Sequence, residues 1–143
     1  MYDAKGDKAR GDKAKQKSEP ITAMELKYIQ STGNITIAEL TDENFVISQA
    51  QDILDIFGNL MFEDCDRLII HERNLHADFF DLKTRLAGDI LQKFSNYKVK
   101  LAIVGDFAKY NSKSLQDFIA ESNKLNTVFF IDTFDSAIQK LEK

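Results

Sequence analysis

Hydrophobic and polar positions follow two different periods along residues 24–143. Two short apolar segments, residues 26–29 and 35–40, flank the turn-forming sequence Ser31-Thr32-Gly33-Asn34, and this arrangement predicts two strands joined as a hairpin. The period then changes, because apolar residues recur every three or four positions from residue 50 to about residue 62. That spacing predicts a first helix with one face in the core.

The first helix also has a start signal. Ser48 and Gln51 stand three residues apart, as in a capping box, and so predict its first turn. The apolar face that we expect to be buried consists of Ala50, Ile53, Leu54, Phe57 and Met61.

Strands and helices alternate through the rest of the chain. Residues 68–70, 99–104 and 127–131 are short apolar runs that predict buried strands. A third helix is expected to open at Ser114, and a short last helix to run through residues 137–141.

The longest helix is expected between the strands at 68–70 and 99–104. Asp78 is the predicted N-cap, Asp81 is favourable in a first turn, and Gly88 suggests a close contact between helices. The apolar positions that support this helix are Phe79, Leu82, Leu86, Ile90 and Phe94.

The element order is therefore ββαβαβαβα. Strands that alternate with helices favour right-handed crossovers and parallel pairing. We expect an α/β fold with a mainly parallel five-stranded sheet, in which only the first strand is antiparallel.

A family resemblance is carried by residues 71–124, with the sequence HERNLHADFFDLKTRLAGDILQKFSNYKVKLAIVGDFAKYNSKSLQDFIAESNK. This segment resembles the core of the bacterial family known as domain of unknown function 4180, and the likeness extends over residues 24–143. The resemblance implies a bacterial, cytosolic protein and no established activity. The element order is similar to that of the sulfate transporter and anti-sigma factor antagonist (STAS) domain, which favours a binding module.

Composition divides the chain in two. Residues 1–23 carry six Lys or Arg against four Asp or Glu, in an imperfect GDKA repeat without large aliphatic side chains before Ile21. Such a segment buries too little apolar surface to offset its ordering entropy, so we expect a disordered leader. A vector or fusion origin is consistent with this composition. Residues 24–143 are expected to form a single folded domain.

Several functional classes are disfavoured. The longest apolar runs fall far short of the roughly 20 residues that cross a membrane, and no secretory signal is present, so we expect a cytoplasmic protein without membrane contacts. The folded part is acidic, which argues against nucleic acid as a partner. Neither GxxxxGK[ST] nor GxGxxG occurs, and no cofactor is expected. The single cysteine, Cys65, is expected to be a half-buried thiol beside a strand.

Candidate chemistry gathers where the parallel strands end. In such sheets, ligands bind beyond the carboxyl ends of the strands, where three loops are expected to meet: residues 71–78, 105–113 and 132–133. The first loop holds both histidines, and its candidate residues for a ligand or partner are His71, Glu72, Arg73, Asn74, His76 and Asp78.

A catalytic reading of that loop uses His71 as base, Glu72 as its orienting partner and Asp106 nearby. Consecutive residues that leave a strand point in opposite directions, however, and no nucleophile is evident near them in sequence. The histidine spacing is not HExxH, so no metal site is predicted, although loop residues could still build one. In the structural alternative, His71 and Asp78 simply cap the strand end and the helix start.

The second loop is a candidate seat for an anion. Backbone amides at the start of the third helix, together with lysines and hydroxyls, would favour a negative ligand. The residues concerned are Lys109, Tyr110, Ser112, Lys113 and Ser114. In the structural alternative, the serines cap the helix and the lysines are solvated.

Two classes of function remain open. The favoured hypothesis is a non-catalytic binding or regulatory module whose partner is another protein or a small anionic ligand. The alternative is a small-molecule enzyme centred on His71, Glu72 and Asp106. Residues 71–83 contain no hydroxyl side chain, so the phosphorylation switch of STAS antagonists is not expected there.

Overall fold

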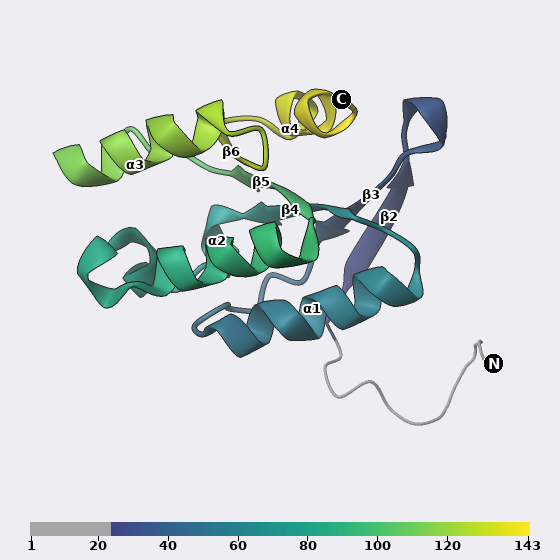
Figure 1. The fold of residues 1–143 in the computed structure, drawn as a ribbon, viewed down its shortest axis with the longest axis horizontal. Coiled ribbons are helices and arrows are strands. Elements are labelled where there is room, and N and C mark those ends of the chain that lie inside the picture. Colours follow the sequence, from purple (N-terminus) through teal and green to yellow (C-terminus); the bar gives the residue numbers. More distant parts are fainter. Residues whose placement is uncertain (1–23) are drawn as a thin grey trace.

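A computed structural model describes residues 24–143, so the expected leader, residues 1–23, lies outside the described residues. The described chain forms one five-stranded sheet (Figure 1). Its strands, in spatial as well as sequence order, are β2 (Leu26–Gln30), β3 (Thr36–Leu40), β4 (Arg67–His71), β5 (Lys100–Val104) and β6 (Val128–Ile131). Strand β2 is antiparallel to β3 and all other neighbours are parallel, which confirms the predicted fold class.

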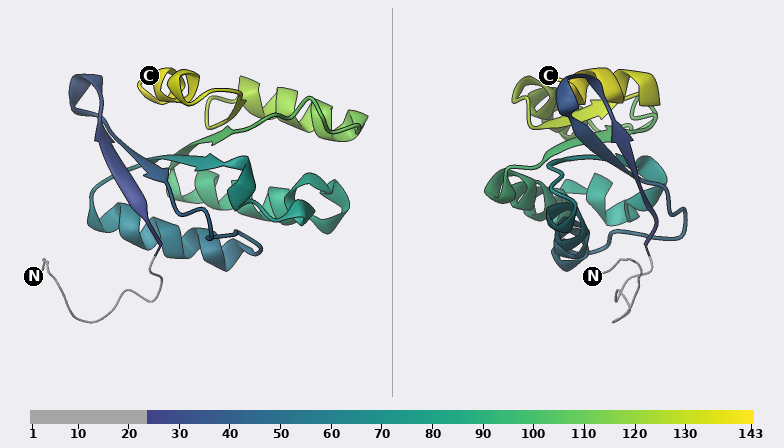
Figure 2. Two further views of the ribbon diagram at one scale, coloured as in Figure 1. Left: turned by 180° about the vertical axis from the view of Figure 1, so that it is seen from behind. Right: turned by 90° about the vertical axis from the view of Figure 1, so that its right-hand side faces the viewer.

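Three helices connect the parallel strands, and a fourth follows them. They are α1 (Ala50–Phe62), α2 (Leu86–Tyr97), α3 (Lys113–Lys124) and α4 (Phe134–Leu141). Because the strands advance across the sheet in one direction, crossovers of one hand place α1, α2 and α3 on the same face. Helices α1 and α2 lie side by side beneath the sheet, and α4 lies on the opposite side (Figures 1 and 2).

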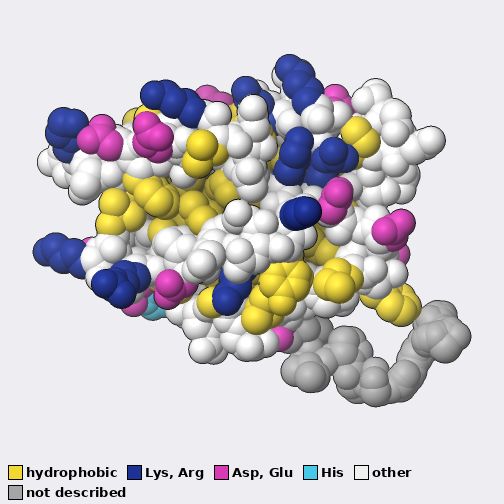
Figure 3. Space-filling model, in the orientation of Figure 1, with side chains coloured by type: hydrophobic (Ala, Val, Ile, Leu, Met, Phe, Trp, Pro, Cys, Tyr) yellow, Lys and Arg dark blue, Asp and Glu magenta, His cyan; other side chains and the backbone are white. Residues whose placement is uncertain are grey.

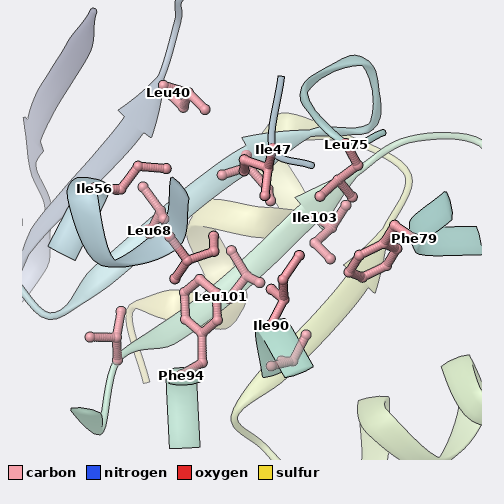
Figure 4. Packing of buried hydrophobic residues seen from close by; sticks show 14 of the residues in the cluster. Leu40, Ile47, Ile56, Leu68, Leu75, Phe79, Ile90, Phe94, Leu101 and Ile103 are labelled. Atoms are coloured by element: carbon pink, nitrogen blue, oxygen red, sulfur yellow. The ribbon is translucent and has the colours of Figure 1, made fainter. Parts of the chain in front are cut away.

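The core has two unequal parts, because successive strand residues point to opposite faces. Leu68 and Ile70 of β4 join the larger cluster between the sheet and helices α1 and α2, where Phe79, Ile90 and Phe94 are also buried (Figure 4). Ile69, which lies between them in sequence, points to the other face, where a smaller cluster packs between the sheet and α4. Its buried members are Ile37, Ile69, Ala102, Phe129, Ala137 and Leu141. One short helix thus covers the second face.

The hairpin turn forms as expected. Gly33 and Asn34 adopt left-handed conformations, with φ of 68° and 63°, residue types that tolerate this region best. The Ser31 hydroxyl donates a hydrogen bond to the carboxylate of Glu142, so the turn is tied to the end of α4.

Helix α1 ends where predicted, but a different residue caps its first turn. The carboxylate of Asp52, not the side chain of Gln51, accepts the backbone N–H groups of Ser48 and Gln49 at 2.9 and 3.3 Å. An ionised acceptor near the positive helix end makes the stronger cap. Met61 was expected in the core but is exposed, although its neighbour Leu60 is completely buried.

The longest predicted helix was wrong in its first two turns. Residues 77–80 and 82–84 form separate 3-10 turns, and the α-helix begins only at Leu86. Arg85 is left-handed, with φ of 67°, and interrupts the helical backbone. The side chain of Asp78 caps no helix, and a Cβ on Gly88 would meet nothing within 4 Å, so the expected close contact there is also wrong.

The last two helices start slightly earlier than predicted. The hydroxyl of Ser112 accepts the backbone N–H of Leu115, so α3 begins at Lys113 rather than Ser114. Thr133 caps α4 in the same way through Ser136. Within residues 24–143, no helix is long and apolar enough to cross a membrane.

Candidate functional site

The parallel strands end at one edge of the sheet, and hydrogen bonds connect the loops that leave them there. Asn74 is completely buried and lies at the centre of this hydrogen-bond network. Its side-chain amide donates to the carbonyl oxygens of Asp42 and Phe45, both at 2.9 Å, and its oxygen accepts the backbone N–H of His71 at 3.1 Å. Asn74 was a candidate ligand residue, but its side-chain amide and oxygen both bond the backbone of neighbouring loops instead.

Residues 41–49, which follow β3, also belong to this edge and were missed by sequence reasoning. Ile47 forms an isolated parallel bridge with Leu75, and its backbone bonds Asn74 and His76 on either side. The signal available in the sequence was the apolar pair Val46-Ile47 between polar residues. It is too short to predict a strand.

Glu72 connects the first loop to the second. Its carboxylate accepts hydrogen bonds from Lys109 Nζ at 2.8 Å, from the backbone N–H of Asp106 at 3.1 Å and from the hydroxyl of Tyr110. We call Glu72, Lys109, Tyr110 and the Asp106 amide the Glu72 cluster. It joins Glu72 of the first loop to residues of the second loop that lie 34 to 38 positions later in the chain.

The environment of the Glu72 cluster separates the pKa values of its members. Partial burial raises the pKa of Glu72, but the bonds from Lys109, Tyr110 and the Asp106 amide outweigh burial, so the net pKa is lowered. Burial and the adjacent Glu72 carboxylate raise the pKa of Tyr110 well above its usual value. At neutral pH, Glu72 is thus an anion and Tyr110 a neutral donor.

Gly105 allows Glu72 to approach the end of β5. A Cβ at this position would lie 2.7 Å from both Cβ and Oε1 of Glu72 and 3.0 Å from Cζ of Phe107. Real side chains do not tolerate such distances, so the close approach of the two loops requires glycine.

Aromatic rings pack between the Glu72 cluster and the hydrophobic core. The Tyr110 ring stacks on Phe80 with centroids 4.5 Å apart and planes 12° apart, and Phe107 meets Phe130 of the core edge-on at 5.2 Å. The amide of Gln116 donates to the carbonyl oxygens of Phe107 and Tyr110. Phe107 and Tyr110 therefore pack across the loop.

A pocket of about 360 Å³ opens beside the cluster. It is lined by Glu72, Arg73, Leu75, Ala77, Phe80, Lys109 and Tyr110. Arg73 is exposed, and no carboxylate of residues 24–143 lies within ion-pairing distance of it. The pocket combines two cationic groups with a stacked aromatic pair.

The comparison with known protein families identifies the group to which this fold and site belong. Residues 32–141 match the model of a family described as Domain of unknown function (DUF4180). The chain belongs to the DUF4180 family. The match begins in the hairpin turn and reaches the end of α4, so it includes both loops of the site. No curated protein and no solved structure matches the chain.

In this DUF4180 domain, His71 lies away from the pocket. Its Nε2 is 2.7 Å from Oε2 of Glu39 on the neighbouring strand, and both side chains are 16% exposed. His71 and Glu72 therefore point in opposite directions, as the strand alternation predicted. The proposed catalytic set is divided, because Asp106 reaches Glu72 only through its backbone amide.

The other histidine of the DUF4180 domain makes local contacts. His76 Nδ1 accepts the backbone N–H of Asp78 at 3.0 Å and lies 3.7 Å from its carboxylate, and both side chains are about half exposed. The described residues contain no group of three His, Cys, Asp or Glu side chains arranged to hold a metal ion.

The expected anion seat at the start of α3 has its lysines turned elsewhere. Lys109 contacts Glu72, whereas Lys113 pairs with Asp117 of its own helix at 2.9 Å. The Ser112 hydroxyl caps the helix and lies 3.3 Å from the Ser114 hydroxyl. Cationic side chains converge instead at the pocket of Arg73 and Lys109.

Proposed function

We propose that this DUF4180 domain is a non-catalytic binding module that recognises an anionic group at the pocket beside the Glu72 cluster. The anion would be carried by a small molecule or by an acidic segment of a partner protein. The observation that carries the proposal is that Arg73 and Lys109 line one pocket, together with the stacked rings of Phe80 and Tyr110.

The chemistry of Arg73 supports this assignment. A guanidinium presents several N–H donors in a planar fork that matches a carboxylate or phosphate. Lys109 has one acceptor in Glu72 but is about half exposed, so its remaining N–H groups can reach an incoming anion. The aromatic pair adds apolar surface to the same pocket, as is usual in ligand sites.

The state of Glu72 favours binding over catalysis. A general base works best when its pKa lies near the working pH, and the pKa of Glu72 is lowered instead. Its carboxylate is also occupied by three donors that hold the loops together. We therefore give the residue a positioning role.

The proposal extends to a regulatory role in the bacterial cytoplasm, supported by the family resemblance and by the STAS-like order of elements. Control at residues 71–83 would not use Ser or Thr phosphorylation, since that segment has no hydroxyl side chain.

Titration with inorganic phosphate and with an acidic peptide, followed by calorimetry, tests the site. Arg73→Gln should weaken the binding of at least one probe about fivefold or more, because it removes the planar donor. Lys113→Gln is the matched control, since it removes one positive charge outside the pocket and should leave affinity unchanged. Equal losses of affinity in both variants would mean that binding depends only on net charge, and would overturn the proposal.

A further inference from the structure

A second and larger pocket lies at the opposite end of the sheet, where the strands begin. Its volume is about 590 Å³. The end of α1, the connection to β4 and the end of α2 supply its lining, which includes Phe57, Met61, Asp64, Cys65, Asp66 and Tyr97. Nothing in the proposed function uses this pocket.

The pocket has an apolar and aromatic wall that is open to solvent. Met61 is 68% exposed and Tyr97 49% exposed, whereas Phe57 behind them is buried with its ring centroid 5.1 Å from that of Tyr97. Figure 3 shows hydrophobic side chains gathered over the right-hand ends of α1 and α2 in that view. Large side chains exposed together around a hollow are typical of a binding surface.

The electrostatics of the same place are negative. Helices α1 and α2 both direct their C-terminal ends here, and neither has a basic residue in its last turn to compensate the helix dipole. Asp64 and Asp66 are exposed at the rim, and no Lys, Arg or His within residues 24–143 lies within ion-pairing distance of either. Lys98 and Lys100 follow α2 closely but do not line the pocket.

The floor of the pocket is already committed to the fold. The Cys65 thiol is buried, rather than half-buried as the sequence suggested, and lies 3.4 and 3.3 Å from the carbonyl oxygens of Thr36 and Arg67. Burial, and to a lesser extent the charge of Asp66, raises the pKa of this thiol, so it is protonated and unreactive. The groups available to a ligand are the two carboxylates and the exposed apolar wall.

We infer that this pocket binds an organic cation, namely an ammonium group carried on an aliphatic chain. The ammonium would lie between the carboxylates of Asp64 and Asp66 and against the face of Tyr97, an arrangement that combines ion pairing with a cation–π contact. The aliphatic part would cover the exposed side chain of Met61. A bare metal ion fits the same place poorly, because Phe57, Met61 and the other apolar lining residues supply no oxygen ligands.

The ammonium could belong to a free amine or to a lysine side chain of a partner, and the chemistry of recognition is the same. Both sources satisfy the negative rim and bury the exposed wall. The experiment therefore includes one probe for each.

The first measurement is a titration of the isotope-labelled protein followed by amide chemical shifts. The probes are n-butylammonium chloride, the neutral n-butanol and the anionic butyrate, at equal ionic strength. Butylammonium should shift amides of residues 57–66 and 97–99 and bind more tightly than either of the other probes. Equal binding of butanol, or shifts confined to other parts of the domain, would overturn the inference.

The variants separate the pocket from net charge. The double variant Asp64→Asn, Asp66→Asn should weaken butylammonium binding about tenfold, since two carboxylates near the cation are lost. Asparagine tolerates the left-handed backbone of Asp64, whose φ is 54°, so the fold should be unaffected. The control Asp117→Asn, Glu121→Gln makes the same charge change on α3 and should leave binding intact. A similar loss in the control would overturn the inference.

The last arm identifies the source of the cation. A capped tripeptide, acetyl-Leu-Lys-Leu-amide, is compared with butylammonium in the wild type and in the double Asn variant. Tighter binding of the peptide would assign the pocket to a partner's lysine, and tighter binding of the amine would assign it to a small molecule. Either result upholds the site if it disappears in the variant, and persistence in the variant overturns it.

Discussion

At the scale of single residues, the packing of the loops at the carboxyl ends of the strands depends on the groups around Glu72. Its carboxylate faces a lysine, a tyrosine hydroxyl and a backbone amide, and each of these donors favours the ionised form. A group whose pKa is lowered on folding stabilises the native state at pH values above its unfolded-state pKa. The contribution is lost as pH falls through the folded-state pKa.

This sign predicts how Glu72→Gln should behave. Near pH 7 the variant should be less stable than wild type by about 1 kcal/mol, because an amide oxygen accepts the same bonds more weakly. The difference should shrink as the pH falls below the ordinary carboxyl value of 4.5. Urea unfolding of both proteins at several pH values measures it. A difference that is independent of pH would contradict this account of Glu72.

Gly105→Ala provides a second test at the same scale. The added Cβ would collide with Glu72, so either the carboxylate or the β5 backbone has to move. We expect a loss of about 1–3 kcal/mol, as in overpacked cores, and a rise in the pKa of Glu72 as its donors move away.

Gly58→Ala is the matched control for Gly105→Ala. A Cβ at Gly58 meets nothing within 4 Å, and the residue is exposed in the interior of α1. The substitution should therefore stabilise the protein by about 0.5–1 kcal/mol through helix propensity. Denaturation curves that show the two alanines acting alike would remove the steric explanation.

Sequence reasoning identified most of these residues but not how they are grouped. Strand alternation was sufficient to predict that His71 and Glu72 diverge. The contact of Glu72 with Tyr110, 38 positions later, depends on how two loops pack, and no local pattern records it. The same is true of the carboxylates of Asp64 and Asp66, which become a candidate site only when the ends of α1 and α2 meet.

At the scale of elements, residues 77–86 show where periodicity misleads. The apolar spacing of Phe79, Leu82 and Leu86 fits a helix, and Phe79 is indeed buried. Asp81 and Thr84 compete with that helix, because their short polar side chains bond nearby backbone groups in non-helical turns. Pattern alone therefore predicted the burial correctly and the backbone wrongly.

Thr84, which precedes the N-cap residue Arg85, holds the turn before α2 through its side chain. The Thr84 hydroxyl accepts the backbone N–H of Leu86 at 3.2 Å and lies within 2.9 Å of the carbonyl oxygens of Asp78 and Asp81. Thr84→Ala should cost about 1 kcal/mol, the usual net value for lost intramolecular hydrogen bonds. Asp78→Ala should change stability by less than about 0.5 kcal/mol, since its exposed side chain caps nothing. Thermal unfolding of the pair distinguishes the observed start from the predicted one.

At the scale of the whole molecule, the two faces of the sheet are covered unequally. Three helices cover one face, whereas the eight-residue α4 covers the other with Ala137 and Leu141. The element order predicted right-handed crossovers, and these place three helices on one face because the strands are also consecutive across the sheet. The short last helix was also predicted, but no sequence pattern indicated the side of the sheet on which it packs.

Leu141→Ala measures how much that single helix contributes. The side chain is completely buried, so its truncation should cost about 2–4 kcal/mol, through lost burial and the cavity left behind. Leu125→Ala removes the same atoms from a side chain that is 70% exposed and should cost less than about 0.5 kcal/mol. Comparable losses in urea unfolding would mean that α4 adds little to the second face.

The consecutive order of the strands has a consequence for how the chain assembles during synthesis. Each strand from β3 to β6 pairs with the strand made just before it, so none has to be inserted between two that have already joined. Contacts between neighbours in sequence form early, because closing short loops costs little entropy. Helix α4 comes after all the strands, and until it docks, Ile69 and Phe129 face water. The interval between the pairing of β6 and the docking of α4 is therefore when a newly made chain is most open to aggregation.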